Sequence, residues 1–171
     1  AWVELNMEHL RHNVRLFQRL LPEGCVLMPA VKANAYGHGM IPVARTCQSM
    51  GIRFFCVATA GEGMELRRQG IEGEILVLGY TAPGLAPVLH DFHLTQTVPE
   101  RRYAERLNES GYPLKVQVKI DTGMHRLGER WDRPEEIARI FACRNLKITG
   151  AFTHLCADET KSPADMTFTL A

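Results

Sequence analysis

Short apolar or alternating runs recur along the chain, and longer stretches with apolar residues every three or four positions separate them. This alternation predicts strands that follow helices in turn. Besides a short alternating stretch at residues 2–5, six runs are expected to be strands: residues 25–28, 54–58, 75–78, 93–98, 116–120 and 148–152. The expected helices are residues 7–21, 40–50, 62–69, 83–89, 99–108 and 134–141. Strands recurring between helices with short loops predict a parallel sheet built from βαβ units.

Residues with known terminal preferences support several of these helix ends. Asn6 is a good cap for the first helix, and Gly51 is suited to a left-handed termination of the helix before it. Pro99 is suited to the first turn of the helix that it opens. Ser162 followed by Pro163 predicts the start of a further helix near the end of the chain.

The pattern alone leaves two sheet architectures open. A closed (β/α) barrel needs eight strands, and six follow the regular rhythm here. An open doubly wound sheet fits the same periodicity equally well. As a barrel, the sheet would keep two unpaired edges where closure should occur.

Composition narrows the classes of function. The chain has 171 residues and a net charge of +1, with no long basic block that would indicate nucleic acid or an anionic membrane surface. No apolar run has the length of a membrane span, and no signal peptide opens the chain. The five cysteines are scattered, which favours free thiols in a reducing cytoplasm over disulfides or zinc. Since the chain begins without methionine and ends within a predicted helix, we expect a longer parent protein.

Lys32 is the first candidate for chemistry. It follows an apolar run at a predicted strand end, the position where α/β barrels place their active sites. Apolar surroundings lower the pKa of a lysine and free its amine for Schiff-base formation with a carbonyl. Most lysines are nevertheless solvated, and the local pattern does not distinguish these two environments.

Two further segments also follow predicted strands. Residues 119–128 carry charged residues around a glycine turn, and residues 152–158 contain a single histidine, His154. Taken alone, the first is typical of a turn and the second of a structural histidine. Both nevertheless lie at strand ends, as Lys32 does, so all three segments are expected to face one mouth. The spacing of His38, His90 and His93 predicts no metal site.

These three segments resemble signatures of the alanine racemase family, whose members are pyridoxal 5'-phosphate (PLP) enzymes with a barrel domain and a second, β-rich domain. Residues 30–39, AVKANAYGHG, are similar to the family's lysine motif. AVKAN alone also resembles related barrel decarboxylases of basic amino acids, and the continuation into YGHG favours the racemases. Residues 119–128 resemble K-x-D-T-G-M-x-R-L-G. Residues 153–158 resemble T-H-x-x-x-A-D, with one residue fewer between His154 and Ala157.

The resemblance implies a role for each matching residue. Lys32 would hold PLP as a Schiff base, and Tyr36 would help to bind its phosphate. Arg126 would contact the substrate carboxylate and the phenolic oxygen of the cofactor, while His154 would pack against the cofactor ring. Lys119 matches a lysine that is carbamylated in some racemases. No metal is implied.

The resemblance also favours the barrel over the open sheet. Residues 1–171 are expected to be the N-terminal PLP-binding domain, an incomplete (β/α)8 TIM-type barrel of about six β/α units. The last barrel strands and the C-terminal β domain would lie outside this chain. A full-length parent is expected to be a homodimer, in which a tyrosine of that second domain reaches across to the partner's site.

The implied reaction is racemisation of a small amino acid, L-alanine to D-alanine, for peptidoglycan precursor synthesis, with Lys32 as one of two bases. Residues 4–6, 27–29 and 119–130 also resemble serine/alanine racemases of vancomycin-resistance clusters. That alternative implies a serine substrate and a cytoplasmic catalytic domain tethered by a membrane module before Ala1. A non-catalytic PLP-binding barrel and an inactive fragment are further alternatives, and we expect the isolated chain to be a poor racemase.

Overall fold

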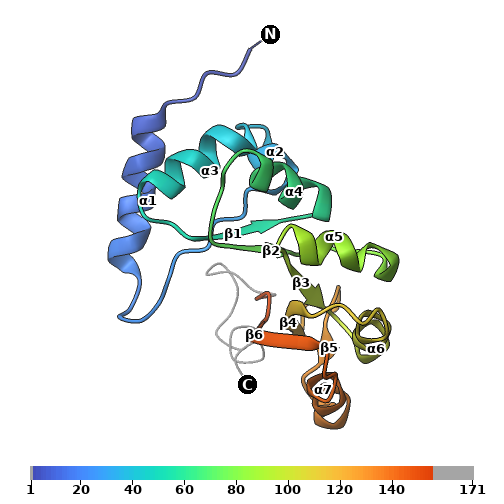
Figure 1. Cartoon of the computed structure of the whole chain (residues 1–171). Helices are drawn as coiled ribbons and strands as arrows, with labels where there is room; N and C mark the ends of the chain where they lie inside the picture. Colours follow the sequence, from blue (N-terminus) through green and yellow to red (C-terminus); the bar gives the residue numbers. More distant parts are fainter. Residues whose placement is uncertain (1, 156–171) are drawn as a thin grey trace. The chain divides into compact units, whose positions relative to one another are not determined.

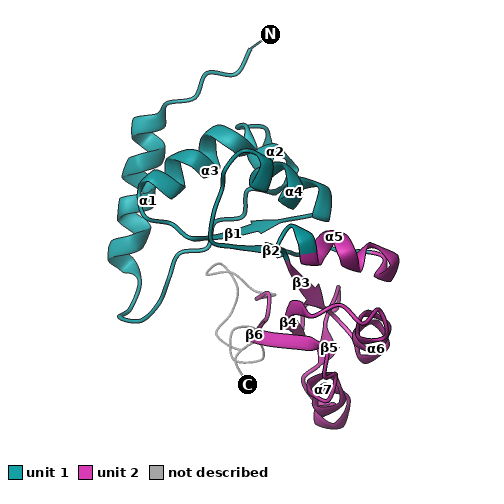
Figure 2. Cartoon of the chain, viewed as in Figure 1, with its two compact units in different colours: residues 1–81, 91–94 teal, residues 82–90, 95–171 magenta. Residues whose placement is uncertain are grey.

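The computed structural model of the chain describes residues 2–155, and they form two compact units. Unit 1 contains residues 2–81 and 91–94, and unit 2 contains residues 82–90 and 95–155 (Figure 2). Each unit combines helices with parallel strands. The predicted helix start at Ser162 lies outside the described residues.

Unit 1 is built around two short parallel strands. β1 (Phe54–Val57) pairs with β2 (Glu74–Val77) in a register that places Phe54 opposite Glu74. The helices of this unit are α1 (Met7–Leu20), α2 (Lys32–Tyr36), α3 (Met40–Ser49) and α4 (Ala60–Arg68). Figure 1 shows α1 beside α3. Apolar residues of both strands are fully buried, among them Phe55 and Ile75, and they form the core of the unit.

Two helix ends follow the sequence prediction. The Asn6 Oδ1 atom accepts hydrogen bonds from the backbone N–H groups of Glu8 (3.0 Å) and His9 (3.2 Å), which confirms the predicted cap of α1. After α3, Gly51 has φ +89°, the left-handed conformation expected of a terminating glycine. Both predictions depend only on residues close in sequence.

Two predicted strands are wrong. Residues 2–5 are not in a strand, and the side chains of Trp2 and Val3 are 87% and 70% exposed. Residues 25–28 are not in a strand either, and only Ala30 forms an isolated parallel bridge, with Cys56. An apolar pattern suits a strand, but the strand forms only where a neighbour supplies backbone partners. Within residues 2–155 these two segments have no such ladder.

Unit 2 is centred on one long strand. β4 (Leu114–Asp121) pairs in parallel with β3 (Thr95–Val98), β5 (Glu129–Arg130) and β6 (Leu146–Phe152). A short 3-10 turn, η1 (Pro83–Leu85), leads into α5 (Ala86–Asp91). The other helices are α6 (Arg101–Glu109) and α7 (Pro134–Phe141), the latter with the predicted bounds. The core of this unit consists of the buried valines of β3 and β4 packed with leucines and isoleucines of the helices.

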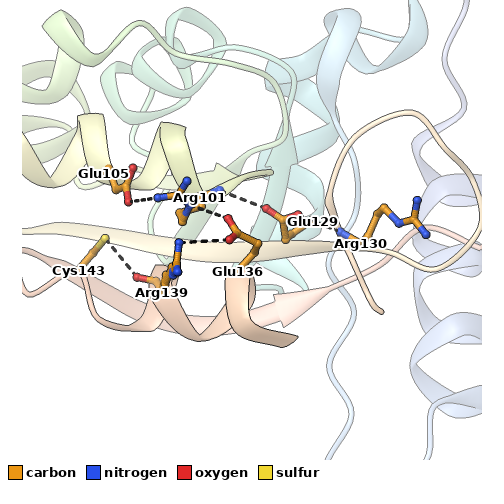
Figure 3. A network of polar contacts seen from close by, with 7 residues as sticks. All are labelled: Arg101, Glu105, Glu129, Arg130, Glu136, Arg139 and Cys143. Carbon is orange, nitrogen blue, oxygen red and sulfur yellow. Dashed lines mark hydrogen bonds and ion pairs between the residues drawn. The ribbon is translucent and has the colours of Figure 1, made fainter. Parts of the chain in front are cut away.

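A polar network joins α6, β5 and α7 (Figure 3). The Arg101 guanidinium forms ion pairs with Glu105, one turn further along α6, and with Glu136 of α7. The backbone N–H of Arg101 also donates a hydrogen bond to the Glu129 carboxylate of β5 (3.3 Å). Because the ion pairs raise the pKa of Arg101 further above its usual value, the guanidinium stays charged at any ordinary pH.

Candidate active site

Lys32 opens a left-handed turn. The four residues after it, Ala33, Asn34, Ala35 and Tyr36, all have φ between 51° and 54°. Left-handed helical conformation costs an L-amino acid roughly 1–2 kcal/mol per residue, and consecutive examples without glycine are rare. The turn is therefore a strained segment that its surroundings must hold in place.

Hydrogen bonds close this turn on both sides. The Ala35 N–H donates to the Val31 carbonyl (2.9 Å), which joins the turn to the residue before Lys32. The Asn34 side-chain Oδ1 accepts from the Met40 N–H (2.8 Å), at the start of α3. The Asn34 carbonyl accepts from the Gly39 N–H (2.9 Å). Asn34 thus ties the left-handed turn to the helix that follows it.

The two side chains of this turn that the sequence singled out are accessible. Lys32 is partly buried, and Tyr36 is 64% exposed. Within the described residues, neither Lys32 nor Tyr36 makes a side-chain hydrogen bond or ion pair. The Cys56 thiol of β1 lies close enough to Lys32 for the two to interact electrostatically. Burial raises the pKa of Cys56 to about 11, and the positive charge of Lys32 opposes that rise.

Lys119 lies near the carboxyl end of β4 and is only 5% exposed. Its Nζ is 5.7 Å from the centre of the Phe152 ring, on the neighbouring strand β6. Burial lowers the pKa of Lys119, the nearby charge of Arg126 lowers it too, and Asp121 acts in the opposite direction. A larger share of this amine is therefore neutral at a given pH than for a solvated lysine.

The loop after β4 folds back on the end of that strand. Asp121 Oδ1 accepts from the backbone N–H groups of Gly123 (3.1 Å) and His125 (3.0 Å). Gly128 has φ +128°, and a Cβ there would lie 2.7 Å from the Asp121 nitrogen, so only glycine fits this close approach. The loop presents Arg126 to solvent, and within residues 2–155 its guanidinium has no hydrogen bond or ion pair.

Asp121 keeps its negative charge in this loop. Burial raises its pKa, but the N–H groups of His125 and Gly123 and the nearby His125 ring outweigh that effect, so the pKa lies below its usual value. The carboxylate organises the turn that leads to Arg126. The sequence motif identified the residues of this loop, while the hydrogen bonds show how it is shaped.

His154 follows β6 and is exposed. The preceding residue, Thr153, anchors it: the Thr153 hydroxyl donates to the Ile120 carbonyl (2.8 Å) and lies 2.7 Å from the Thr122 hydroxyl. These bonds join the carboxyl ends of β4 and β6. The remainder of the histidine motif, from Cys156 onward, lies outside the described residues.

The structure therefore groups the sequence-predicted residues into two sets. Lys32 and Tyr36 share the left-handed turn of unit 1, while Lys119, Arg126 and His154 lie at the ends of adjacent strands in unit 2. That all of them face one mouth stays a prediction, since each unit is defined separately. The donor set fits PLP: an amine suits its aldehyde, and a phenol and a guanidinium suit phosphate, phenolate or carboxylate oxygens.

Comparison with known proteins gives a consistent result. The family model "Alanine racemase, N-terminal domain" matches residues 5–170. An amino-acid racemase of Enterococcus faecalis is 44% identical over 99% of this chain, which corresponds to 24% of that protein. An alanine racemase of Carboxydothermus hydrogenoformans is 40% identical over 93% of this chain and 44% of its own length. The chain thus spans half or less of the length of these relatives.

Solved structures agree with the sequence comparison. The alanine racemase of Clostridium difficile 630, in complex with cycloserine, matches with a TM-score of 0.89 and 33% identity over 98% of this chain and 48% of that one. This likeness confirms the predicted α/β class with an incomplete barrel. None of the helices within residues 2–155 is long and apolar enough to cross a membrane. The chain belongs to the alanine racemase family, whose enzymes depend on PLP, and corresponds to its N-terminal domain.

Proposed function

We propose that the protein containing this chain racemises a small amino acid with PLP as cofactor, converting L-alanine to D-alanine for peptidoglycan precursors. The family match across residues 5–170 carries this proposal, together with the strained turn that holds Lys32. Strain of this kind persists where it serves a site, because the surrounding structure must maintain it.

Bound PLP supplies an electron-accepting ring that stabilises the charge left when the substrate loses its Cα proton. Lys32 would hold the cofactor through its Nζ and would also move a proton at one face of the substrate Cα. The exposed Tyr36 would donate a hydrogen bond from its hydroxyl to the cofactor phosphate. Arg126 would orient the substrate carboxylate with its planar pair of donors, and His154 would pack against the cofactor ring.

We further propose that Lys119 is carbamylated. The lone pair of its neutral amine attacks the carbon of carbon dioxide, the electrons of one C=O bond move to oxygen, and an N–H proton leaves to solvent, so the neutral amine becomes a carbamate anion. Burial and the neighbouring charge of Arg126 both favour the neutral amine that this reaction needs. The anion would then attract the Arg126 guanidinium and orient it toward the substrate.

Inversion also needs a proton donor on the opposite face of Cα. We assign that role to the partner subunit of a homodimer, in the part of the longer relatives that this chain does not span. The isolated chain is then expected to bind PLP but to racemise alanine poorly.

The test is chemical trapping. The chain is incubated with PLP, reduced with borohydride and mapped by peptide mass spectrometry. A pyridoxyl adduct on Lys32 that disappears in Lys32→Ala, but persists in Lys147→Ala, would support the proposal. Lys147 is an exposed lysine of β6 and serves as the matched control. A folded chain that forms no more adduct on Lys32 than on Lys147 would contradict it.

Serine is the second candidate substrate. The identity of 44% to an Enterococcus faecalis amino-acid racemase, of which this chain matches only 24%, favours a racemase domain within a larger protein. A membrane-tethered parent with a cytoplasmic catalytic domain would have this organisation. Chiral analysis of D-alanine and D-serine formed by the longer protein distinguishes the two: a higher kcat/KM for serine would replace alanine as the substrate.

A further inference from the structure

Glu62 of α4 makes two contacts that an ordinary helix-capping residue does not make. Thr59 and Glu62 have the spacing of a capping box, and Thr59 Oγ1 accepts from the Glu62 N–H (3.2 Å) as that motif requires. In the usual box the glutamate would turn back to the N–H of the capping residue. Here Glu62 Oε1 accepts from the Ala33 N–H (2.8 Å) and Oε2 from the Ala58 N–H (2.7 Å).

These two N–H groups belong to a missing step of the β-ladder. The Ala30–Cys56 bridge consists of two bonds, from the Cys56 N–H to the Pro29 carbonyl and from the Val31 N–H to the Cys56 carbonyl, both 2.9 Å. A parallel ladder that continued would next pair Lys32 with Ala58. Its two donors would be the N–H groups of Ala58 and Ala33, the pair that the Glu62 carboxylate binds.

The carbonyl partners of that missing step are bound elsewhere. The Val31 carbonyl accepts from the Ala35 N–H (2.9 Å), and the Ala58 carbonyl accepts from the Gly79 N–H (3.0 Å). Without Glu62, the N–H groups of Ala33 and Ala58 would therefore need other hydrogen-bond partners. We call the point where the chain at Lys32 separates from β1 the fork. The carboxylate occupies the place where Lys32 leaves the sheet and the left-handed turn begins.

A carboxylate suits this position for two physical reasons. It offers two acceptor oxygens, one for each N–H, and charge-assisted hydrogen bonds are stronger than neutral ones. It also lies in the first turn of α4, where the helix dipole favours negative charge. Glutamine would present one acceptor and one donor, so its amide group would oppose one of the two N–H groups.

We propose that Glu62 is a positioning residue for Lys32: its carboxylate holds the fork between β1 and the left-handed turn, and thereby fixes where the lysine amine reaches the cofactor aldehyde. This inference rests on the proposed role of Lys32. It assigns to Glu62 a function beyond helix capping, exerted through the main chain. Within residues 2–155, the Glu62 carboxylate binds only these two backbone donors.

The experiment compares Glu62→Gln with Glu65→Gln in the same helix. Glu65 also accepts one side-chain hydrogen bond, from Gln69 Nε2 (3.0 Å), so the control has the same substitution and a comparable local loss. Two quantities are measured for each folded variant: the PLP concentration for half-maximal borohydride-trapped adduct on Lys32, and the exchange rates of the Ala33 and Ala58 amide hydrogens. Chemical denaturation gives the stability of each variant.

Loss of one charge-assisted hydrogen bond predicts about tenfold weaker adduct formation and about tenfold faster exchange at Ala33 or Ala58 in Glu62→Gln. Glu65→Gln should match wild type in both, even if its stability falls equally. Adduct formation by Glu62→Gln at wild-type affinity would overturn the proposal. If wild type itself forms no adduct on Lys32, the proposed function fails. In that event the exchange rates alone test the role of Glu62. Faster exchange would support its hold on the two N–H groups, and unchanged exchange would overturn it.

Discussion

Replacing Ala33 with glycine should stabilise the chain, the reverse of the usual effect of this substitution. Ala33 is exposed and has φ 51° and ψ 46° within the left-handed turn. Glycine occupies this region without steric cost, whereas an L-residue loses roughly 1–2 kcal/mol there. Because Ala33 buries little surface, the substitution removes strain without leaving a cavity.

The net gain is smaller than the strain removed. Glycine increases the conformational entropy of the unfolded chain, which offsets about 0.4–1 kcal/mol of the gain. We therefore expect the free energy of unfolding to rise by roughly 0.5–1 kcal/mol in Ala33→Gly. For a chain of this size that corresponds to an increase in Tm of about 1–4 °C.

The matched control is Ala138→Gly. Ala138 is also exposed, but it lies inside the right-handed helix α7. There glycine should cost about 1 kcal/mol, because it frees the unfolded chain and removes no strain. Urea denaturation followed by circular dichroism measures both variants against wild type. If Ala33→Gly lost as much stability as Ala138→Gly, the argument from left-handed strain would be refuted.

Three other substitutions test the electrostatics. Burial lowers the pKa of Lys119 below its usual 10.5, so between that lowered pKa and 10.5 the folded chain binds fewer protons than the unfolded chain and its stability should rise with pH. Lys119→Met should abolish this rise, measured by denaturation as the pH approaches 10.5. Burial raises the pKa of Cys56 from 9.0 to about 11, so the contribution of its thiol to folding stability is complete below pH 9 and is lost as the pH rises toward 11. In the same assay, the free energy of unfolding of wild type should fall by roughly 2 kcal/mol between pH 9 and pH 11 relative to Cys56→Ala. Arg101→Met should lower Tm more than the same substitution at its exposed neighbour Arg102, and added salt should reduce the difference in Tm. Equal Tm values would show that the ion pairs of Arg101 do not stabilise the fold.

Features that depend on nearby residues could be predicted from the sequence. The cap at Asn6, the glycine termination after α3 and the bounds of α7 each follow from a short stretch of chain. The strand expected at residues 25–28 failed because a strand needs a neighbour, and no local pattern says whether one is present. The same limit applies to residues 2–5.

The candidate site likewise has features that the sequence predicts and features that depend on residues distant in sequence. A lysine after an apolar run did not by itself identify a cofactor site, and the resemblance of whole motifs singled out Lys32 and Arg126. No residue preference predicts a left-handed turn through two alanines. The carboxylate that binds its first N–H group lies 29 residues away in sequence. The backbone geometry of the site is therefore a tertiary property, which short-range patterns do not contain.

The strained turn, held by the Glu62 carboxylate, leads to a test of whether its strain positions Lys32. If strain at Ala33 served only as an incidental cost, Ala33→Gly would be more stable and would form the Lys32 adduct as well as wild type. If the strained turn positions the lysine, glycine should widen the range of conformations at Lys32 and weaken adduct formation while stability increases. Opposite changes in stability and adduct formation cannot come from partial unfolding, which would lower both. The pair of measurements therefore separates positioning of Lys32 from a general loss of structure.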